Sequence, residues 1–200
     1  FTSSTGNLIT RNTIVVDGGT DGNGFHFSVG SNTISYNNIT TTGSGNTKYG
    51  INWFSAVSNV TIFGNTITTG INGGGSTNYG IYAQGQYNNI SNNVIRTSGS
   101  GSENHGINAG GLLDSNITNN VIFTGGVSGN HGIQLLSSAD GNFFSNNNIT
   151  TGGTGTDNYG IHFLGNADDH YFTFNNITTT SSSTDYGVFF DTSGGGNADR

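Results

Sequence analysis

The chain has 200 residues, of which 30% are hydrophobic and only 8% charged, and its formal net charge is −7. A nucleic-acid partner is excluded, because such proteins need many Lys and Arg side chains to displace counterions and this chain has four. Cys and Met are absent, which excludes disulfides and thiolate metal sites. No apolar stretch approaches the roughly 18 residues of a membrane span. We therefore expect no membrane span, no metal and no cofactor.

Pro is also absent, and Ile, Val, Thr, Phe and Tyr recur at fixed intervals, which indicates ordered β-structure instead of disorder. Three marks repeat along the chain. The first is a Gly followed by an apolar residue, at Gly24-Phe25, Gly50-Ile51, Gly80-Ile81, Gly106-Ile107, Gly132-Ile133, Gly160-Ile161 and Gly187-Val188. The second is a single apolar position, at Ile9, Ile34, Ile62, Ile90, Ile117, Phe144 and Phe172. The third is an Ile five residues later, at Ile14, Ile39, Ile67, Ile95, Ile122, Ile149 and Ile177.

The third series advances in steps of 25, 28, 28, 27, 27 and 28 residues. Three short β-runs per period, separated by Gly, Ser, Asn and Thr, predict three strands per coil instead of hairpins. Each strand then pairs in parallel with its own copy about 4.8 Å away, and the usual preference of parallel crossovers makes the winding right-handed. The predicted fold is all-β: a right-handed parallel β-helix of about seven coils with three short parallel sheets, forming one domain over residues 1–200.

An Asn stands two residues before each Ile of the third series, at Asn12, Asn37, Asn65, Asn93, Asn120, Asn147 and Asn175. A tight bend between two strands favours a residue that tolerates the left-handed region and forms local hydrogen bonds. Stacked amides can also donate to one neighbouring copy and accept from the other, which satisfies polar groups inside a dry core. We predict a structural asparagine ladder at this bend.

This repeat resembles the pectate-lyase-like superfamily and its parallel β-helix relatives, whose short turn between the second and third sheets carries a similar asparagine ladder. The resemblance covers essentially the whole chain. It implies that Gly-Ile begins the first-sheet strand, and that the Ile9 and Ile14 columns lie in the second and third sheets. It is specific for fold and says little about function, because function depends on sites built on such scaffolds.

Alternation along the strands predicts which columns face the core and which do not. The inward residues beside the three apolar columns are Phe27, Trp53, Ala83, Ala109, Leu135, Phe163 and Phe190. The residues before the Gly column predict an aromatic stack of Tyr49, Tyr79, His105, His131, Tyr159 and Tyr186, headed by Asn23. The outward residues of the first sheet are His26, Asn52, Tyr82, Asn108, Gln134, His162 and Phe189. A metal at His105 and His131 would need further ligands, and the neighbouring columns supply Asn and Gly.

The densest ionisable group comprises His162, Asp168, Asp169 and Asp191, with His170 beside them. Paired carboxylates about 5–10 Å apart can hydrolyse glycosides, so the alternative function is a carbohydrate-active enzyme (a polysaccharide lyase or glycoside hydrolase) or a sugar-binding module. No Arg or Lys lies nearby in the sequence, and Asp168-Asp169 falls in an expected turn. A solvated turn is the favoured interpretation, and enzymatic activity is left uncertain, with a non-catalytic protein preferred.

The outward positions of the third sheet are rich in Thr and Asn, so an ice-binding face is a third alternative. Arg96 and Phe123 interrupt that array. Together with Val94 and Val121 they predict an apolar contact patch, because exposed apolar clusters often mark interaction surfaces.

Six sequons provide possible glycosylation sites, at Asn38, Asn59, Asn89, Asn116, Asn148 and Asn176. Neither end of the repeat shows a capping helix, and its last strand is followed in phase by its first. We therefore expect self-association, end to end or lateral, or a segment of a longer solenoid. The leading expectation is an extracellular or cell-surface structural protein that forms filaments and has adhesive or polysaccharide-contacting faces.

Overall fold

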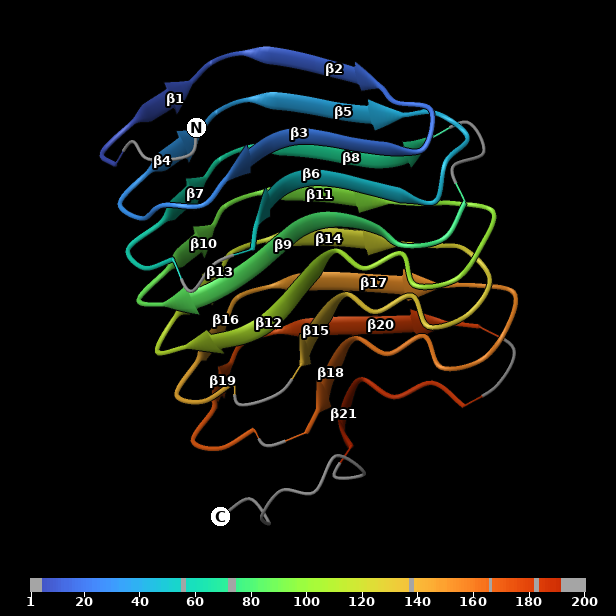
Figure 1. Ribbon diagram of the computed structural model, residues 1–200. Helices are drawn as coiled ribbons and strands as arrows, with labels where there is room; N and C mark the ends of the chain where they lie inside the picture. Colours follow the sequence, from blue (N-terminus) through green and yellow to red (C-terminus); the bar gives the residue numbers. More distant parts are fainter. Residues whose placement is uncertain are drawn as a thin grey trace.

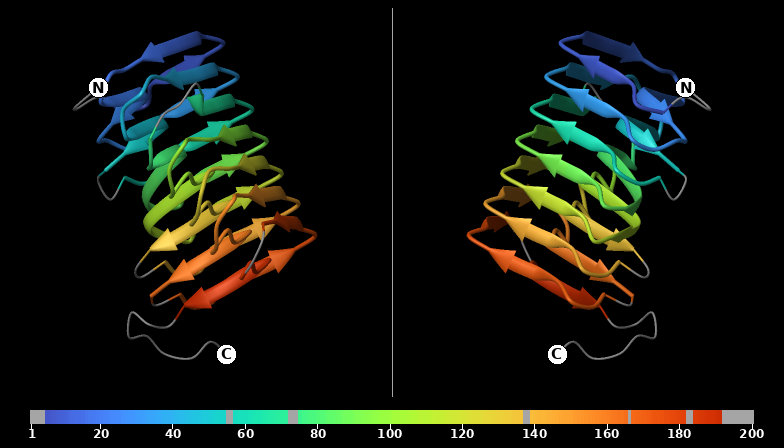
Figure 2. Two further views of the ribbon diagram at one scale, coloured as in Figure 1. Left: turned by 90° about the vertical axis from the view of Figure 1, so that its right-hand side faces the viewer. Right: turned by 90° about the vertical axis from the view of Figure 1, so that its left-hand side faces the viewer.

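The computed structural model describes residues 5–54, 57–71, 75–136, 139–165, 167–181 and 184–191. Within these ranges the chain forms strands and turns and no helix. The strands belong to three parallel sheets of seven strands each, and every strand pairs with its copy in the next coil (Figure 1). The chain is a parallel β-solenoid, and the side views in Figure 2 show its coils stacked along one axis. No helix in the described part is long and apolar enough to cross a membrane.

We name the sheets A, B and C in the order in which the chain first visits them. Sheet A contains β1 (Leu8–Thr10), β4 (Thr33–Ser35), β7 (Thr61–Phe63), β10 (Asn89–Ser91), β13 (Asn116–Thr118), β16 (Phe143–Ser145) and β19 (Tyr171–Thr173). Sheet B contains β2 (Thr13–Asp17), β5 (Asn38–Thr42), β8 (Thr66–Ile71), β11 (Val94–Thr97), β14 (Val121–Thr124), β17 (Asn148–Gly152) and β20 (Asn176–Thr180). Sheet C contains β3 (Asp21–Phe27), β6 (Thr47–Trp53), β9 (Asn78–Gln86), β12 (Ile107–Leu113), β15 (Ile133–Leu136), β18 (Ile161–Leu164) and β21 (Val188–Asp191).

The solenoid makes about six turns, not the predicted seven. Seven copies of a strand enclose only six intervals, so the path from β1 to β19 completes six turns and the chain then adds only β20 and β21. The predicted register is otherwise confirmed. For example, Ile90 pairs with Ile62 and Ile117, and Ile95 pairs with Ile67 and Ile122.

The interior is a narrow column of stacked apolar side chains. The Ile residues of the central coils are fully buried, as are Trp53, Ala83 and Phe144. Trp53 satisfies its indole N–H by donating to the Gln84 carbonyl oxygen at 2.6 Å. The predicted inward residue of the last coil, Phe190, is 41% exposed because no further coil covers it in the described structure.

The Gly column does not begin the strands as expected: it lies inside β3, β6 and β9 and directly before β12, β15, β18 and β21. Glycine is required there because sheet B lies directly against this position. A Cβ placed on Gly106 would meet Cγ2 of Ile122 and would lie 2.6 Å from the Gly132 carbonyl oxygen. The same clash recurs at the equivalent Gly of each inner coil. The Gly column thus reflects close approach of two sheets, and a side chain at this position would force them apart.

This contact gives a stability prediction. Gly106→Ala should lower the free energy of unfolding by about 2–3 kcal/mol, the upper range for overpacking a tight core. Gly125→Ala is the matched control, because its Cβ would have no neighbour closer than 3.9 Å. Chemical denaturation of both variants checks the difference. Equal midpoints for the two would show that the sheets can separate at no cost.

The predicted asparagine ladder lies at the corner between sheets A and B and is fully formed. From Asn12 to Asn147, each Asn donates its backbone N–H and its Nδ2 to Oδ1 of the ladder Asn in the next coil, at 2.9–3.1 Å. From Asn37 onward, each Nδ2 also donates to a sheet A carbonyl oxygen in the preceding coil. The five ladder residues from Asn37 to Asn147 are buried.

The expectation that the ladder Asn itself makes the bend is wrong. The left-handed residue is the one before it, with φ of 54–66° at Arg11, Tyr36, Gly64, Asn92, Asn119, Asn146 and Phe174. The chain therefore turns one residue earlier, and the Asn enters the next strand with its amide directed along the column. A non-glycine residue in this conformation costs about 1–2 kcal/mol, which the ladder hydrogen bonds offset.

Candidate functional site

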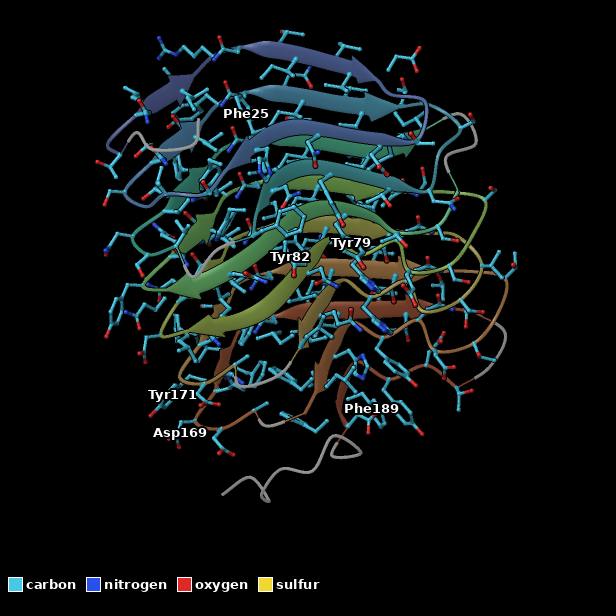
Figure 3. All side chains as sticks on the ribbon, viewed as in Figure 1. Phe25, Tyr79, Tyr82, Asp169, Tyr171 and Phe189 are labelled. Atoms are coloured by element: carbon cyan, nitrogen blue, oxygen red, sulfur yellow. The ribbon has the colours of Figure 1, made fainter. Side chains whose placement is uncertain are left out.

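The outer face of sheet C carries the largest set of aromatic side chains that contact one another. Tyr49, Tyr79, His105, His131, Tyr159 and Tyr186 form the predicted stack, with successive ring centroids 4.9–5.5 Å apart. Parallel, in-register strands place each ring beside its copy in the next coil, which explains this spacing. Figure 3 shows Tyr79 and Tyr82 on this face, midway along the stack of coils.

The centre of the stack is closed to solvent. His105, His131 and Tyr159 are 1%, 5% and 7% exposed. In the neighbouring outward column, Asn52, Asn108 and His162 are also buried, although alternation places them on the outer side of the sheet. Three of the seven outward positions of sheet C are thus covered, whereas His26 is exposed and Tyr82, Gln134 and Phe189 are half-buried.

Three histidines of this layer form a neutral cluster. The backbone N–H of Tyr159 donates to Nδ1 of His131 at 3.2 Å, so we assign the proton of this imidazole to Nε2. That Nε2 lies 3.2 Å from Nδ1 of His162 and can donate to it. Nδ1 of His105 accepts from the backbone N–H of His131 in the same way. The role of these histidines is therefore structural: they form hydrogen bonds and ring contacts between neighbouring coils.

Burial opposes charging of these imidazoles. It lowers the pKa of His105 to about 3 and the pKa of His131 to about 2, and the neighbouring imidazoles add to both shifts. Burial also lowers the pKa of His162, against a smaller opposite effect of Asp191 and Asp157. Histidines held neutral in this way are poor general acids near neutral pH.

The accessible part of the face is a shallow hollow near its first coils. It has a volume of about 290 Å³ and is lined by Asp21, Asn23, Thr47, Tyr49, Asn52 and Phe54. Phe54 is 52% exposed and follows β6 directly. Its ring contacts Tyr82, His26 and Tyr49 at centroid distances of 5.3, 5.6 and 6.2 Å. An exposed aromatic ring supported by other rings, beside carboxylate, amide and hydroxyl groups, is suited to a ligand with both apolar and polar faces.

The four predicted catalytic candidates occupy two different places. His162 on β18 and Asp191 on β21 lie on neighbouring strands of sheet C, with Leu164 paired to Asp191. Asp168 and Asp169 lie in the turn between β18 and β19. Asp169 is exposed with φ of 57°, and Figure 3 places it beside Tyr171 and away from Phe189.

The turn has a structural explanation. The backbone N–H of Asp168 donates to Oδ1 of Asp140 at 3.1 Å, and the backbone N–H of Gly141 donates to the Asp168 carbonyl oxygen at 3.0 Å. These bonds join successive copies of the same turn. In the described part of the chain, no group of three or more His, Asp or Glu side chains is placed to hold a metal ion.

The predicted contact patch is brought together on sheet B. Val94 and Arg96 on β11 pair with Val121 and Phe123 on β14. The Arg96 guanidinium carbon lies 4.9 Å from the Phe123 ring centroid, within range of a cation–π contact. The pair interrupts the Thr- and Asn-rich face between Thr68 and Thr150.

The sequons are mostly accessible. Asn38, Asn148 and Asn176 are exposed on sheet B, Asn116 is exposed on sheet A, and Asn89 is half-buried. Asn59 is exposed in a turn with φ of 59°.

Sequence reasoning missed two further polar columns and the accessible aromatic residue. One column, at the corner between sheets B and C, links Asn78, Asn104, Asn130, Asn158 and Asp185. The other, between sheets C and A, starts at the backbone N–H of Val60 and continues through the side chains of Asn88, Ser115, Asn142 and His170. Phe54 was detectable in principle, because it follows the inward Trp53 and alternation then directs it outward.

Comparison with known proteins found no matching protein family, no matching curated protein and no matching solved structure.

Proposed function

We propose that this protein is an extracellular or cell-surface structural β-solenoid that contacts polysaccharide through the aromatic face of sheet C. The observation that supports this most is the hollow beside Phe54, where an exposed ring adjoins the exposed side chains of Asp21 and Asn23. Sugar rings have an apolar C–H face and a polar edge, which match these two kinds of group. A secreted location agrees with the exposed sequons at Asn38, Asn116, Asn148 and Asn176.

The proposal includes right-handed winding and kinship with the pectate-lyase-like superfamily. Winding is inferred from the preference of parallel crossovers, and kinship from the asparagine ladder and its short turn.

Binding to immobilised polysaccharides tests the function. Phe54→Ala should weaken retention at least about tenfold, since an aromatic hot spot contributes about 2 kcal/mol or more to binding and about 1.4 kcal/mol is tenfold. Phe123→Ala is the matched control, because this Phe is exposed on sheet B. Equal loss in both variants, or in neither, would contradict the assignment to sheet C.

The enzyme alternative has weaker support. Glycoside hydrolysis needs two carboxyl groups facing one substrate, whereas Asp168 and Asp169 lie in an inter-coil turn and Asp191 lies on sheet C. An ice-binding face on sheet B has less support too, because Arg96 and Phe123 stand within it.

Filament formation is part of the proposal, and its support is the exposed core of the last described coil. Phe172, Val188 and Phe190 are 37%, 38% and 41% exposed. A second copy stacked on this coil would bury them. Sedimentation velocity over increasing concentration should show growing assemblies, and Phe190→Asp should reduce them while Phe123→Asp should not. Concentration-independent monomers would contradict end-to-end stacking, and loss only with Phe123→Asp would favour lateral contact.

A further inference from the structure

We propose that the hollow beside Phe54 is a binding site for a small quaternary ammonium compound of the choline type. This inference goes beyond the proposed function, because it assigns a second class of ligand to the same hollow. It rests on Tyr49, Phe54 and Asp21, which line the hollow from two neighbouring coils.

Two aromatic rings form a corner in the hollow. The rings of Tyr49 and Phe54 lie at 81° to each other, and their centroids are 6.2 Å apart. A cation in this corner can therefore lie within about 6 Å of both centroids, which is the range of a cation–π contact. Phe54 is 52% exposed and Tyr49 is half-buried, so neither ring is closed to solvent.

The corner is held in place before any ligand binds. Tyr82 packs against both rings, with centroid distances of 5.3 Å to Phe54 and 5.9 Å to Tyr49. The hydroxyl of Tyr82 accepts a hydrogen bond from Nε2 of Gln84 at 2.9 Å. His26 contacts Phe54 as well, at 5.6 Å between ring centroids. Rings that are already positioned lose little conformational freedom on binding, which favours affinity for a small ligand.

A carboxylate stands beside the corner. Asp21 is exposed and pairs in register with Thr47, two residues before Tyr49 on the same face of sheet C. No Lys or Arg is among the described residues that line the hollow. Lys48 is fully buried, and its ammonium donates to the Thr20 carbonyl oxygen at 3.2 Å. The hollow thus combines a negative charge with two aromatic rings in a chain of net charge −7, and all three attract a cation.

The polar atoms of the hollow favour a cation without N–H groups. Oδ1 of Asn23 already accepts a hydrogen bond from Nδ2 of Asn52 at 3.1 Å. A primary ammonium has three donors that each need an acceptor. A quaternary ammonium has none, and its methyl groups can lie directly against the ring faces. The hollow therefore suits a quaternary ammonium better than a primary one.

A metal ion and a bulky ligand fit less well. A hard metal cation needs several oxygen ligands, and no group of three or more His, Asp or Glu side chains in the described part of the chain is placed to hold one. The volume of about 290 Å³ is at the lower end of the range for small-molecule sites. A small organic cation meets both limits.

Titration of the full, isotopically labelled chain with three probes, followed by NMR, tests the inference. The probes are choline, neopentylcarbinol, in which carbon replaces the nitrogen of choline, and phosphocholine, the head group found in lipids. We expect choline to bind at least about fivefold more tightly than either of the others. Neopentylcarbinol lacks the charge, and the phosphate of phosphocholine is repelled by Asp21. Binding of choline should shift the resonances of Tyr49 and Phe54.

Substitutions separate the two contributions. Phe54→Ala should weaken choline binding at least about fivefold, and Asp21→Asn should weaken it about threefold, because an exposed ion pair contributes less than a ring contact. The matched controls are Phe123→Ala on sheet B and Asp169→Asn in the turn after β18, both at exposed residues. These two variants should bind choline as the parent chain does.

Absence of choline binding, or binding of neopentylcarbinol or phosphocholine as tight as that of choline, would overturn the inference. Equal losses in the control variants would overturn it too, because they would place the cation elsewhere. None of these results changes the retention of immobilised polysaccharide, which tests the proposed function separately. Circular dichroism of each variant confirms that the exposed substitutions leave the solenoid folded.

Discussion

Asn120→Ala is expected to lower the free energy of unfolding by about 3–5 kcal/mol. The Asn120 side chain donates to the Ile90 carbonyl oxygen at 2.9 Å and to Oδ1 of Asn147 at 3.1 Å, and it accepts two bonds from Asn93 at 3.0 Å. Its removal leaves the Asn93 N–H and the Ile90 carbonyl buried without these partners, and each such group costs about 1–3 kcal/mol.

Asn116→Ala is the matched control, because this Asn is exposed in the same coil and lies outside the ladder. Urea denaturation should leave its midpoint close to that of the parent chain and shift that of Asn120→Ala strongly. If Asn120→Ala were as stable as the control, water or a local rearrangement would have to form hydrogen bonds with the Asn93 N–H and the Ile90 carbonyl oxygen. The ladder would then contribute little to the stability of the fold.

Acidification from pH 7 to pH 4.5 is expected to remove about 5 kcal/mol of stability through His105 and His131. Both have folded-state pKa values far below 6.5, at about 3 and about 2. Between those values and 6.5 the unfolded chain binds protons that the folded chain does not, so stability is full above pH 6.5 and falls as the pH decreases. Each histidine loses about 1.4 kcal/mol per pH unit over the two units between pH 6.5 and pH 4.5. The sum for His105 and His131 is about 5 kcal/mol.

The double variant His105→Tyr, His131→Tyr should lose most of this dependence, because Tyr already occupies the same column at Tyr79 and Tyr159 and is neutral throughout this range. His26→Gln, which replaces an exposed histidine, should retain it. Denaturation midpoints across the range check the slopes. A parent chain equally stable at both pH values would show that the imidazoles are accessible to solvent.

The repeat was predictable because each coil uses the same three apolar columns at nearly constant spacing. The spacing is constant because each residue must lie directly beside its copy in the next coil. The asparagine ladder was predictable for the same reason, since Ile14 and its later equivalents always stand five positions after Ile9 and its equivalents. The column from Asn78 to Asp185 was missed because the turns between sheets B and C vary in length and are rich in other polar residues.

Left-handed residues were misplaced for a related reason. Arg11, Tyr36 and Phe174 adopt φ values of 55–57° although their side chains do not favour that region. The ladder beside them imposes the turn at these three positions. The equivalent positions Gly64, Asn92, Asn119 and Asn146 carry residue types that favour this region, and they were the available signal. The aromatic hollow was missed because Asp21, Asn23 and Phe54 belong to different coils and become neighbours only when the strands stack.

A crystal structure of the chain with cellohexaose bound would test the central claim most directly. We predict an intact oligosaccharide on the outer face of sheet C, with a sugar ring stacked on Phe54 and hydroxyl groups bonded to Asp21 and Asn23. Density for a cleaved sugar beside His162 and Asp191, or for a ligand on the Arg96–Phe123 patch of sheet B, would contradict it.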